Sequence, residues 1–275
     1  MLLALAAAAL YGLSDFIGGM AARKTSVWPI GFLTAFGATL GALVLAVTHG
    51  STATRTDLEW ALVGGVGQGI GMSFLFRGFV RGQMALVAPV SAVGAVIGPL
   101  VAALANGERP AAPGWYGIAL AVPAIWLVSR QVESGAKSIG PSGLTDGIIS
   151  GVGFGLLFAG LGQVSDGVGY WPLTAAQLAA TVTTAGIAVG LGGNPRPRAL
   201  LDLWGLIAGG LAALAVACFL LAKSYGLLTV AAVITALYPA FTVLLAITIA
   251  RERVNRAQAA GLALCAASVV LVSLV

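Results

Sequence analysis

The chain has 275 residues, of which 59% are hydrophobic and only 8% are charged, and its formal net charge is +5. A soluble domain carries about 25% charged residues, so this composition excludes a water-soluble fold and predicts an integral membrane protein. The 14 basic residues are scattered over short polar segments and form no basic face, which argues against a nucleic-acid partner.

Apolar segments long enough to cross a bilayer follow one another along the chain. With about 20 residues per span, the pattern predicts ten transmembrane helices near 2–22, 28–49, 58–80, 83–105, 114–130, 144–165, 170–191, 202–222, 227–250 and 257–275. The first segment lacks a basic leader, so we interpret it as a helix and not as a secretory signal. The polar stretch 130–143 is rich in Gly, Ser and Pro, which is typical of a linker.

The second half of the chain repeats the first half. Residues 82–129 align with residues 226–273. At a shift of 143 or 144 residues the alignment pairs Gly12 with Gly155, Trp60 with Trp204, Glu108 with Glu252, and Arg109 with Arg253. A long internal repeat of this kind decides the architecture. We therefore expect a first repeat over 1–130, a linker over 131–143 and a second repeat over 144–275.

Each predicted repeat holds five helices, and this odd number matters for topology. The second repeat then enters the membrane from the opposite side, so the two repeats are inverted relative to each other. Inverted repeats around a midplane site are the build of many secondary transporters. The predicted fold class is an all-α polytopic membrane protein with ten transmembrane helices in two inverted five-helix repeats.

Two turns and the first helix carry a family resemblance. The fourth predicted helix of each repeat ends in Gly107-Glu108-Arg109 or Arg251-Glu252-Arg253, and the first helix contains Tyr11-Gly12-Leu13-Ser14-Asp15-Phe16. With the repeat and the helix count, the chain resembles the EamA family of the drug/metabolite transporter superfamily over nearly its whole length. The resemblance implies a carrier of small organic metabolites whose central cavity is lined by the first, third, fourth, sixth, eighth and ninth helices. The second copy departs from the pattern, because Val233 replaces Pro89.

One acidic side chain lies deep inside a predicted helix. Asp15 is about 10 Å from the Arg23-Lys24 end of its helix, and an ionisable group at that depth is costly unless it faces a cavity or a partner. It could bind an amine or another cation, or exchange protons with the cargo. Arg77 lies toward the same membrane side, so it could pair with Asp15, or it could reach the lipid headgroups.

Other polar side chains in apolar segments complete the candidate set. Amide and phenol groups near mid-membrane need hydrogen-bond partners and often point inward, which favours Gln68 and Tyr238. Hydroxyl groups are weaker candidates because they commonly bond back to their own helix. The binding or coupling candidates are Asp15, Arg77, Gln68, Tyr238, Tyr11, Ser14 and Ser91, with Ser73 and Thr235 as lesser ones.

Three prolines are hinge candidates. Pro89, Pro99 and Pro239 remove backbone hydrogen bonds, so they either hinge their helices or fix a bend that improves packing. The glycine-rich stretch 64–71 lacks the spacing of a nucleotide-binding loop and is typical of close helix packing. We expect no metal and no cofactor, because His49 has no Cys or carboxylate cluster at ligand spacing.

Lys and Arg residues are divided unequally between the two alternating sets of loops. One set, with its adjoining helix ends, carries eleven, and the other carries only Arg55, Arg109 and Lys223. Basic loops stay in the cytoplasm, so this count predicts that both termini lie outside. The family resemblance implies both termini inside, and the sequence leaves the orientation open.

These observations favour a multi-pass carrier of the inner or plasma membrane. It would move small organic metabolites or drugs by alternating access, with amino-acid-like solutes compatible and export the favoured direction. The expected partners are the solute, the bilayer and protons as coupling ion. A membrane-embedded enzyme acting on lipid or isoprenoid would need clustered carboxylates or His at a water-facing helix end; that enzyme and a non-transporting scaffold are the alternatives. The sequence leaves the cargo and the oligomeric state open.

Overall fold

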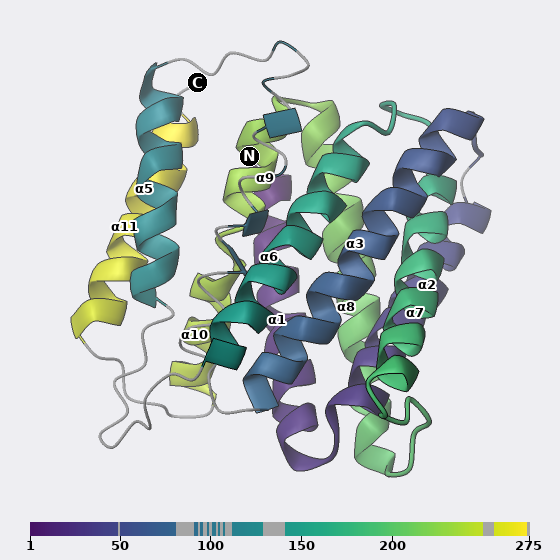
Figure 1. Cartoon of the computed structure of the whole chain (residues 1–275). Coiled ribbons are helices and arrows are strands. Elements are labelled where there is room, and N and C mark those ends of the chain that lie inside the picture. The colour runs from purple at the N-terminus through teal and green to yellow at the C-terminus, as the bar shows by residue number, and fades with distance from the viewer. Residues whose placement is uncertain are drawn as a thin grey trace.

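The structure is a computed structural model that describes residues 1–48, 50–80, 112–128, 141–249 and 256–273, with a few single positions between 91 and 107. Every regular element in these residues is a helix, and the long helices run side by side as a bundle (Figure 1). The elements are α1 (Leu2–Lys24), α2 (Val27–Thr48), α3 (Arg55–Val80), α5 (Ala112–Val128), α6 (Pro141–Gly162), α7 (Trp171–Gly190), η1 (Leu200–Leu203), α8 (Trp204–Ser224), α9 (Leu228–Thr235), α10 (Tyr238–Thr248) and α11 (Arg256–Ser273).

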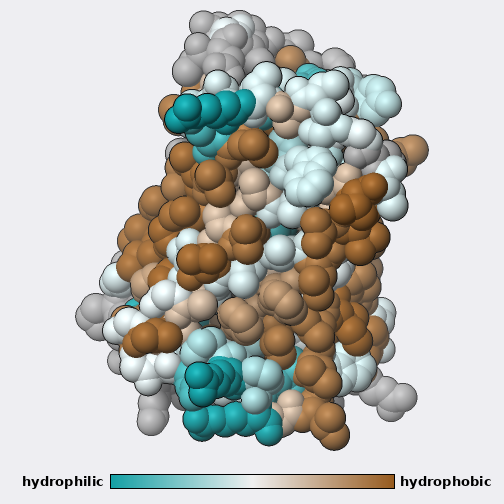
Figure 2. Space-filling model, turned by 90° about the vertical axis from the view of Figure 1, so that its right-hand side faces the viewer, coloured by the Kyte–Doolittle hydropathy of each residue, from teal (hydrophilic) through white to brown (hydrophobic). Residues whose placement is uncertain are grey.

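The surface and the helix lengths suit a bilayer. Figure 2 shows an apolar middle between a hydrophilic top and a hydrophilic bottom on the face that it displays. Five segments are long and apolar enough to cross a membrane, namely Leu2–Ala22, Val27–Thr48, Thr145–Gly162, Trp171–Gly190 and Leu200–Ser224. The expected helix 83–105 falls largely outside the described residues, so the count of ten stays a prediction.

The prediction of one continuous helix over 227–250 is wrong. The structure has α9 and α10 in its place, separated by Ala236 and Leu237. The amide of Leu237 donates to the carbonyl of Ile234 at 3.2 Å, which is a tighter turn than an α-helix makes. Pro239 contributes to this break, because it has no N–H to donate to the carbonyl four residues earlier and the regular hydrogen-bond ladder stops here.

The two halves of the chain are interleaved. α3 packs along α6 and α7, α8 packs along α1 and α2, and α5 packs along α11. Each of these pairs joins one helix from the first half to one from the second half. The third helix of each half therefore packs on the first and second helices of the other half.

Glycines let these helices approach closely. A Cβ atom at Gly67 of α3 would lie 2.6 Å from the carbonyl oxygen of Gly153 in α6. A Cβ atom at Gly37 of α2 would lie 2.6 Å from the carbonyl oxygen of Leu206 in α8. Both distances are shorter than a carbon–oxygen contact allows, so a larger residue would push the helices apart. Gly67 belongs to the stretch 64–71, whose predicted packing role is confirmed.

A carboxylate fixes the start of the third helix in each half. Asp57, in the first turn of α3, accepts hydrogen bonds from the backbone N–H of Thr54 at 2.8 Å and from that of Ser165 at 2.7 Å. Asp202, in η1 before α8, accepts a hydrogen bond from the N–H of Arg198 at 2.8 Å. These bonds satisfy donors that a helix start leaves unpaired. The bond to Ser165 also ties α3 to the loop between α6 and α7.

Candidate functional site

A buried carboxylate lies in the middle of α1. Asp15 is only 9% exposed, and within the described part of the chain neither a hydrogen bond nor an ion pair reaches its carboxylate. A charge held in an apolar bundle without a partner is costly. The group is therefore suited to take up a proton, a cation or a polar part of a ligand.

Two tyrosines flank Asp15. Tyr11 lies one turn earlier on α1, Tyr238 begins α10, and their ring centroids are 6.3 Å apart. The contact of α10 with Gly12 brings Tyr238 to the same part of α1, and neither hydroxyl makes a hydrogen bond with a described residue. Ser91 lies beside Tyr238, and the buried hydroxyl of Thr235, at the end of α9, has no hydrogen-bond partner among the described residues. Polar atoms that need partners are thus gathered around the break between α9 and α10.

A close contact between α1 and α10 positions Tyr238 near Asp15. A Cβ atom at Gly12 would lie 2.9 Å from the carbonyl oxygen of Tyr238 and 2.6 Å from Cβ of Phe241. The hydroxyl of Thr242 donates to the carbonyl of Gly12 at 3.3 Å. Only glycine fits at this crossing, which places the start of α10 one turn from Asp15.

The repeat supplies this carboxylate only once. At the shift that aligns Gly12 with Gly155, Asp15 aligns with Phe158 of α6. The ring of Phe158 meets that of Tyr11 edge-on, with centroids 6.4 Å apart. The first helices of the two halves thus contribute an acid from one side and an apolar ring from the other.

Arg77 has a different partner from the one that the sequence suggested. Its Nη2 lies 2.5 Å and its Nε lies 3.1 Å from Oδ1 of Asp146, at the start of α6. The guanidinium also lies 4.5 Å from the ring centroid of Phe74. The possible pair with Asp15 is therefore not formed. Sequence reasoning missed Asp146. A signal was available, because Asp146 lies in the first turns of a predicted helix that begins at the same membrane side as Arg77.

Gln68 belongs to a second polar group. Its Nε2 donates to Oε1 of Gln177 in α7 at 2.9 Å, and both residues are buried. One turn further along α7, the hydroxyls of Thr181 and Thr39 are 2.9 Å apart. This group links α2, α3 and α7, and no hydrogen bond among the described residues joins it to Asp15. Gln177 was missed because one glutamine in an apolar helix does not reveal which helix it faces.

The serine candidates divide into two kinds. Ser14 donates to the carbonyl of Ala208 in α8 at 2.8 Å, and Ser73 donates to the carbonyl of Gly69 in its own helix at 2.7 Å. The first bond ties α1 to α8, whereas the second lies within α3. Ser91 contacts the hydroxyl of Ser150 at 2.8 Å and also lies beside Tyr238.

Comparison with models of known protein families shows which family this chain matches. The model of the EamA-like transporter family matches residues 1–130 and 142–274, which is nearly the whole length. The chain belongs to the EamA-like transporter family. This family is part of the drug/metabolite transporter superfamily, and its members are transporters. The EamA-like protein described here is accordingly an integral, multi-pass membrane protein.

A solved structure has a similar fold. A crystal structure described only as that of a protein is 17% identical, with a TM-score of 0.75, and the alignment covers 99% of this chain and 96% of that one. At this identity the likeness concerns the fold alone. None of the curated proteins matches the chain.

Of the three proline hinge candidates, the structure describes one. Pro89 and Pro99 lie outside the described residues, whereas Pro239 is in the first turn of α10, directly after the helix break. In the described part of this EamA-like protein, no group of three or more His, Cys, Asp or Glu residues could hold a metal ion. The described residues bring one carboxylate, two phenols and the hydroxyl of Thr235 to the region of Asp15.

Proposed function

We propose that this EamA-like protein is a secondary transporter that moves small organic solutes by alternating access, with Asp15 as its coupling and binding group. The observation that carries the proposal is the buried carboxylate of Asp15, which lies one turn from Tyr11 and from the contact of Gly12 with Tyr238 and has no partner among the described residues. A structural carboxylate in a membrane bundle is normally paired, as Asp146 is with Arg77. A carboxylate without such a partner can exchange a proton or a cation as the carrier changes conformation.

The arrangement of the helices supports an inverted repeat of ten helices. The contacts of α3 with α6 and α7 are mirrored by those of α8 with α1 and α2. Such near-equivalent halves can exchange conformations, which converts an opening on one side into an opening on the other. We propose repeats over 1–130 and 144–275, a cell-membrane location, and export as the direction of flux.

The chemistry around Asp15 favours a cargo with a basic nitrogen. A carboxylate attracts an ammonium group, the faces of Tyr11 and Tyr238 favour cations, and their hydroxyls can bond to a polar substituent. Amines and amino-acid-like solutes meet these requirements. A proton that binds Asp15 in place of the cargo would couple export of an amine to the proton gradient.

Uptake into liposomes tests the proposal. The purified protein is reconstituted with an imposed pH gradient, and pooled metabolites are screened for gradient-dependent flux. We expect a flux that Asp15→Asn abolishes, because the amide can neither ionise nor exchange a proton. The matched control is Asp166→Asn, which removes a half-exposed carboxylate that pairs with Lys223 away from the site and should leave the flux intact. Undiminished flux in a folded Asp15→Asn protein would reject the coupling role.

A further inference from the structure

We infer that Phe76 and Phe219 are the two gates of the Asp15 site, one toward each membrane surface. The inference rests on the proposed transport function, since a gate has a purpose only if the site opens in turn to both sides. It assigns a role to two buried aromatic side chains that neither bind cargo nor belong to the polar groups described above.

The two rings lie at similar depths in the third helix of each half, although the repeat aligns Phe76 with Leu220 and not with Phe219. Phe76 lies near the end of α3 and Phe219 near the end of α8, which are the third helices of their halves. They are the largest side chains among those described as fully buried, at 1% and 0% exposure. Because α3 ends where α1 ends, whereas α8 ends beside the start of α9 near the N-terminus, the two rings lie toward opposite ends of the bundle (Figure 1).

Phe76 lies one turn before the end of α3, where its ring faces α1 and α2. A Cβ atom at Gly18 of α1 would lie 3.1 Å from its Cζ, and one at Gly31 of α2 would lie 3.7 Å from its Cδ2. The ring therefore fills a space between α1, α2 and α3. Apolar side chains complete the seal around the ring, namely Ala21, Ala22, Val27, Ile30 and Met72.

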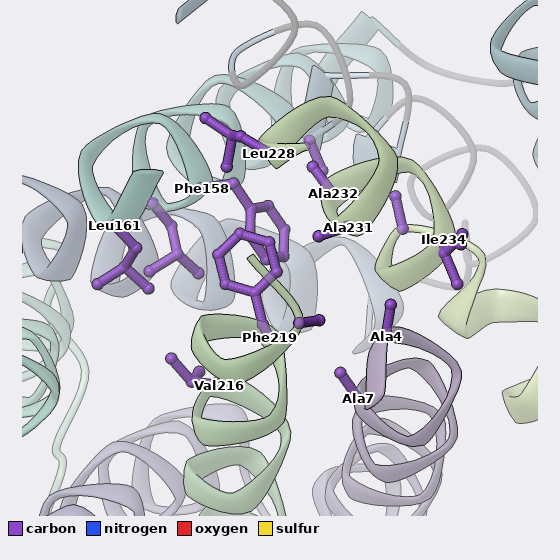
Figure 3. Close-up of a cluster of buried hydrophobic side chains, with 14 of the residues drawn as sticks. Ala4, Ala7, Phe158, Leu161, Val216, Phe219, Leu228, Ala231, Ala232 and Ile234 are labelled. Atoms are coloured by element: carbon purple, nitrogen blue, oxygen red, sulfur yellow. The ribbon is translucent and has the colours of Figure 1, made fainter. Parts of the chain in front are cut away.

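Phe219 lies near the end of α8. Its ring meets that of Phe158 in α6, with centroids 4.9 Å apart and an angle of 62° between the planes. Figure 3 shows the two rings next to each other in the centre of a cluster, with Leu228 of α9 and Ala4 of α1 around them. The pair therefore fills a space between α1, α6, α8 and α9.

The Asp15 site lies between these two seals. Gly18, which touches Phe76, is one turn after Asp15 on α1, and Tyr11, which touches Phe158, is one turn before it. One turn of helix is about 5.4 Å. Along α1, Asp15 thus lies between the contact with Phe76 and the contact with Phe158, each about one turn away.

Each ring bridges one pair of helices that is otherwise poorly packed, namely α1 and α3 for Phe76, and α6 and α8 for Phe219. α3 packs mainly on α6 and α7 and only lightly on α1, and α8 packs mainly on α1 and α2 and only lightly on α6. A light contact between two helices that is filled by one ring can separate and close again with little loss of helix packing. The same equivalence of α3 and α8 that supports alternating access would make the two gates open in alternation.

Side-specific labelling tests the inference. In a background with Cys218→Ala and Cys265→Ala, Thr235→Cys places a thiol at the buried hydroxyl next to Tyr238. A membrane-impermeant maleimide is then added to spheroplasts or to inside-out vesicles, and labelling is measured by mass spectrometry. The parent should label slowly from both sides. We expect Phe76→Ala to raise the labelling rate about tenfold from one side only, and Phe219→Ala to raise it from the other side only, as open populations grow.

Three comparisons decide the outcome. Phe32→Ala removes a ring that stacks on Phe36, 6.1 Å away on α2, and should not change labelling. Phe76→Leu keeps most of the bulk and should stay near the parent rate, which separates a lost seal from a damaged fold. Labelling of both alanine variants from the same side, or no increase in variants that elute as folded protein, would overturn the inference. The labelling assay needs no cargo. Its result can therefore be interpreted even if the liposome assay detects no transport.

Discussion

At the scale of single residues, burial and pairing separate two acidic side chains that look alike in the sequence. Asp146 is buried and accepts hydrogen bonds from Arg77, whereas Asp15 is buried and lies beside two phenols that do not bond to it. A paired buried charge mainly holds helices together. An unpaired one is a cost that function has to explain.

The pair of Arg77 and Asp146 should contribute to stability. Removing one partner leaves an uncompensated buried charge, so Asp146→Leu should destabilise the protein by about 3 kcal/mol. The double variant Arg77→Met/Asp146→Leu should recover most of this loss, because no charge is left without a partner. Unfolding in detergent micelles, followed by circular dichroism, measures both. Equal losses in the single and double variants would show that packing, and not charge, sets the effect.

The phenol of Tyr238 should matter for cargo more than for folding. Its hydroxyl makes no hydrogen bond with a described residue, so Tyr238→Phe removes no bond within that part of the protein. We expect weaker cargo binding, by about tenfold if one hydrogen bond is lost, with an unchanged unfolding midpoint. Titration with the transported solute and thermal unfolding in the same detergent test this. A lower midpoint with unchanged affinity would place the hydroxyl in a structural role.

At the scale of elements, the interruption between α9 and α10 is the feature with the clearest functional consequence. A straight helix over 227–250 would continue its regular ladder past Tyr238. The tight turn at Ala236 and Leu237 changes the direction of the chain, and Gly12 then receives the carbonyl of Tyr238. The break is thus part of how the site is assembled.

Restoring the missing backbone donor should strengthen the helix and weaken the site. Pro239→Ala supplies an N–H that can bond to the carbonyl four residues earlier, which favours one continuous helix. We expect equal or higher thermal stability together with reduced flux, because Tyr238 would rotate away from Asp15. The liposome assay and thermal unfolding measure the two quantities. Full flux in this variant would mean that the break does not depend on the missing donor.

At the scale of the whole molecule, the unequal distribution of basic residues bears on orientation. The lower end in Figure 1 holds the ends of α1 and α3, and the loop from α7 to η1 with Arg196 and Arg198. These segments belong to the set of loops to which the sequence count assigns eleven basic residues. If basic segments stay in the cytoplasm, both termini face outward.

Labelling of the linker tests that orientation. Ser138→Cys, in the background without Cys218 and Cys265, should not react with an impermeant maleimide added to intact cells, and it should react after the cells are opened. The charge distribution is the physical reason, because moving many Lys and Arg residues across the membrane is unfavourable. Rapid labelling of intact cells would reverse the orientation and place both termini in the cytoplasm.

Composition and residue pattern were enough to establish the membrane class, the positions of most helices, the repeat and the family. These follow from runs of apolar residues and from the register of similar residues, all of which are local properties. The same pattern singled out Asp15, Tyr11 and Tyr238. The partners became known only from the folded chain: Arg77 with Asp146, Gln68 with Gln177, and a broken helix beside Asp15. The partner of a polar side chain depends on the rotation of its helix and on its depth against the neighbouring helices. A helix that is apolar on all sides has a hydropathy pattern that specifies neither the rotation nor the depth.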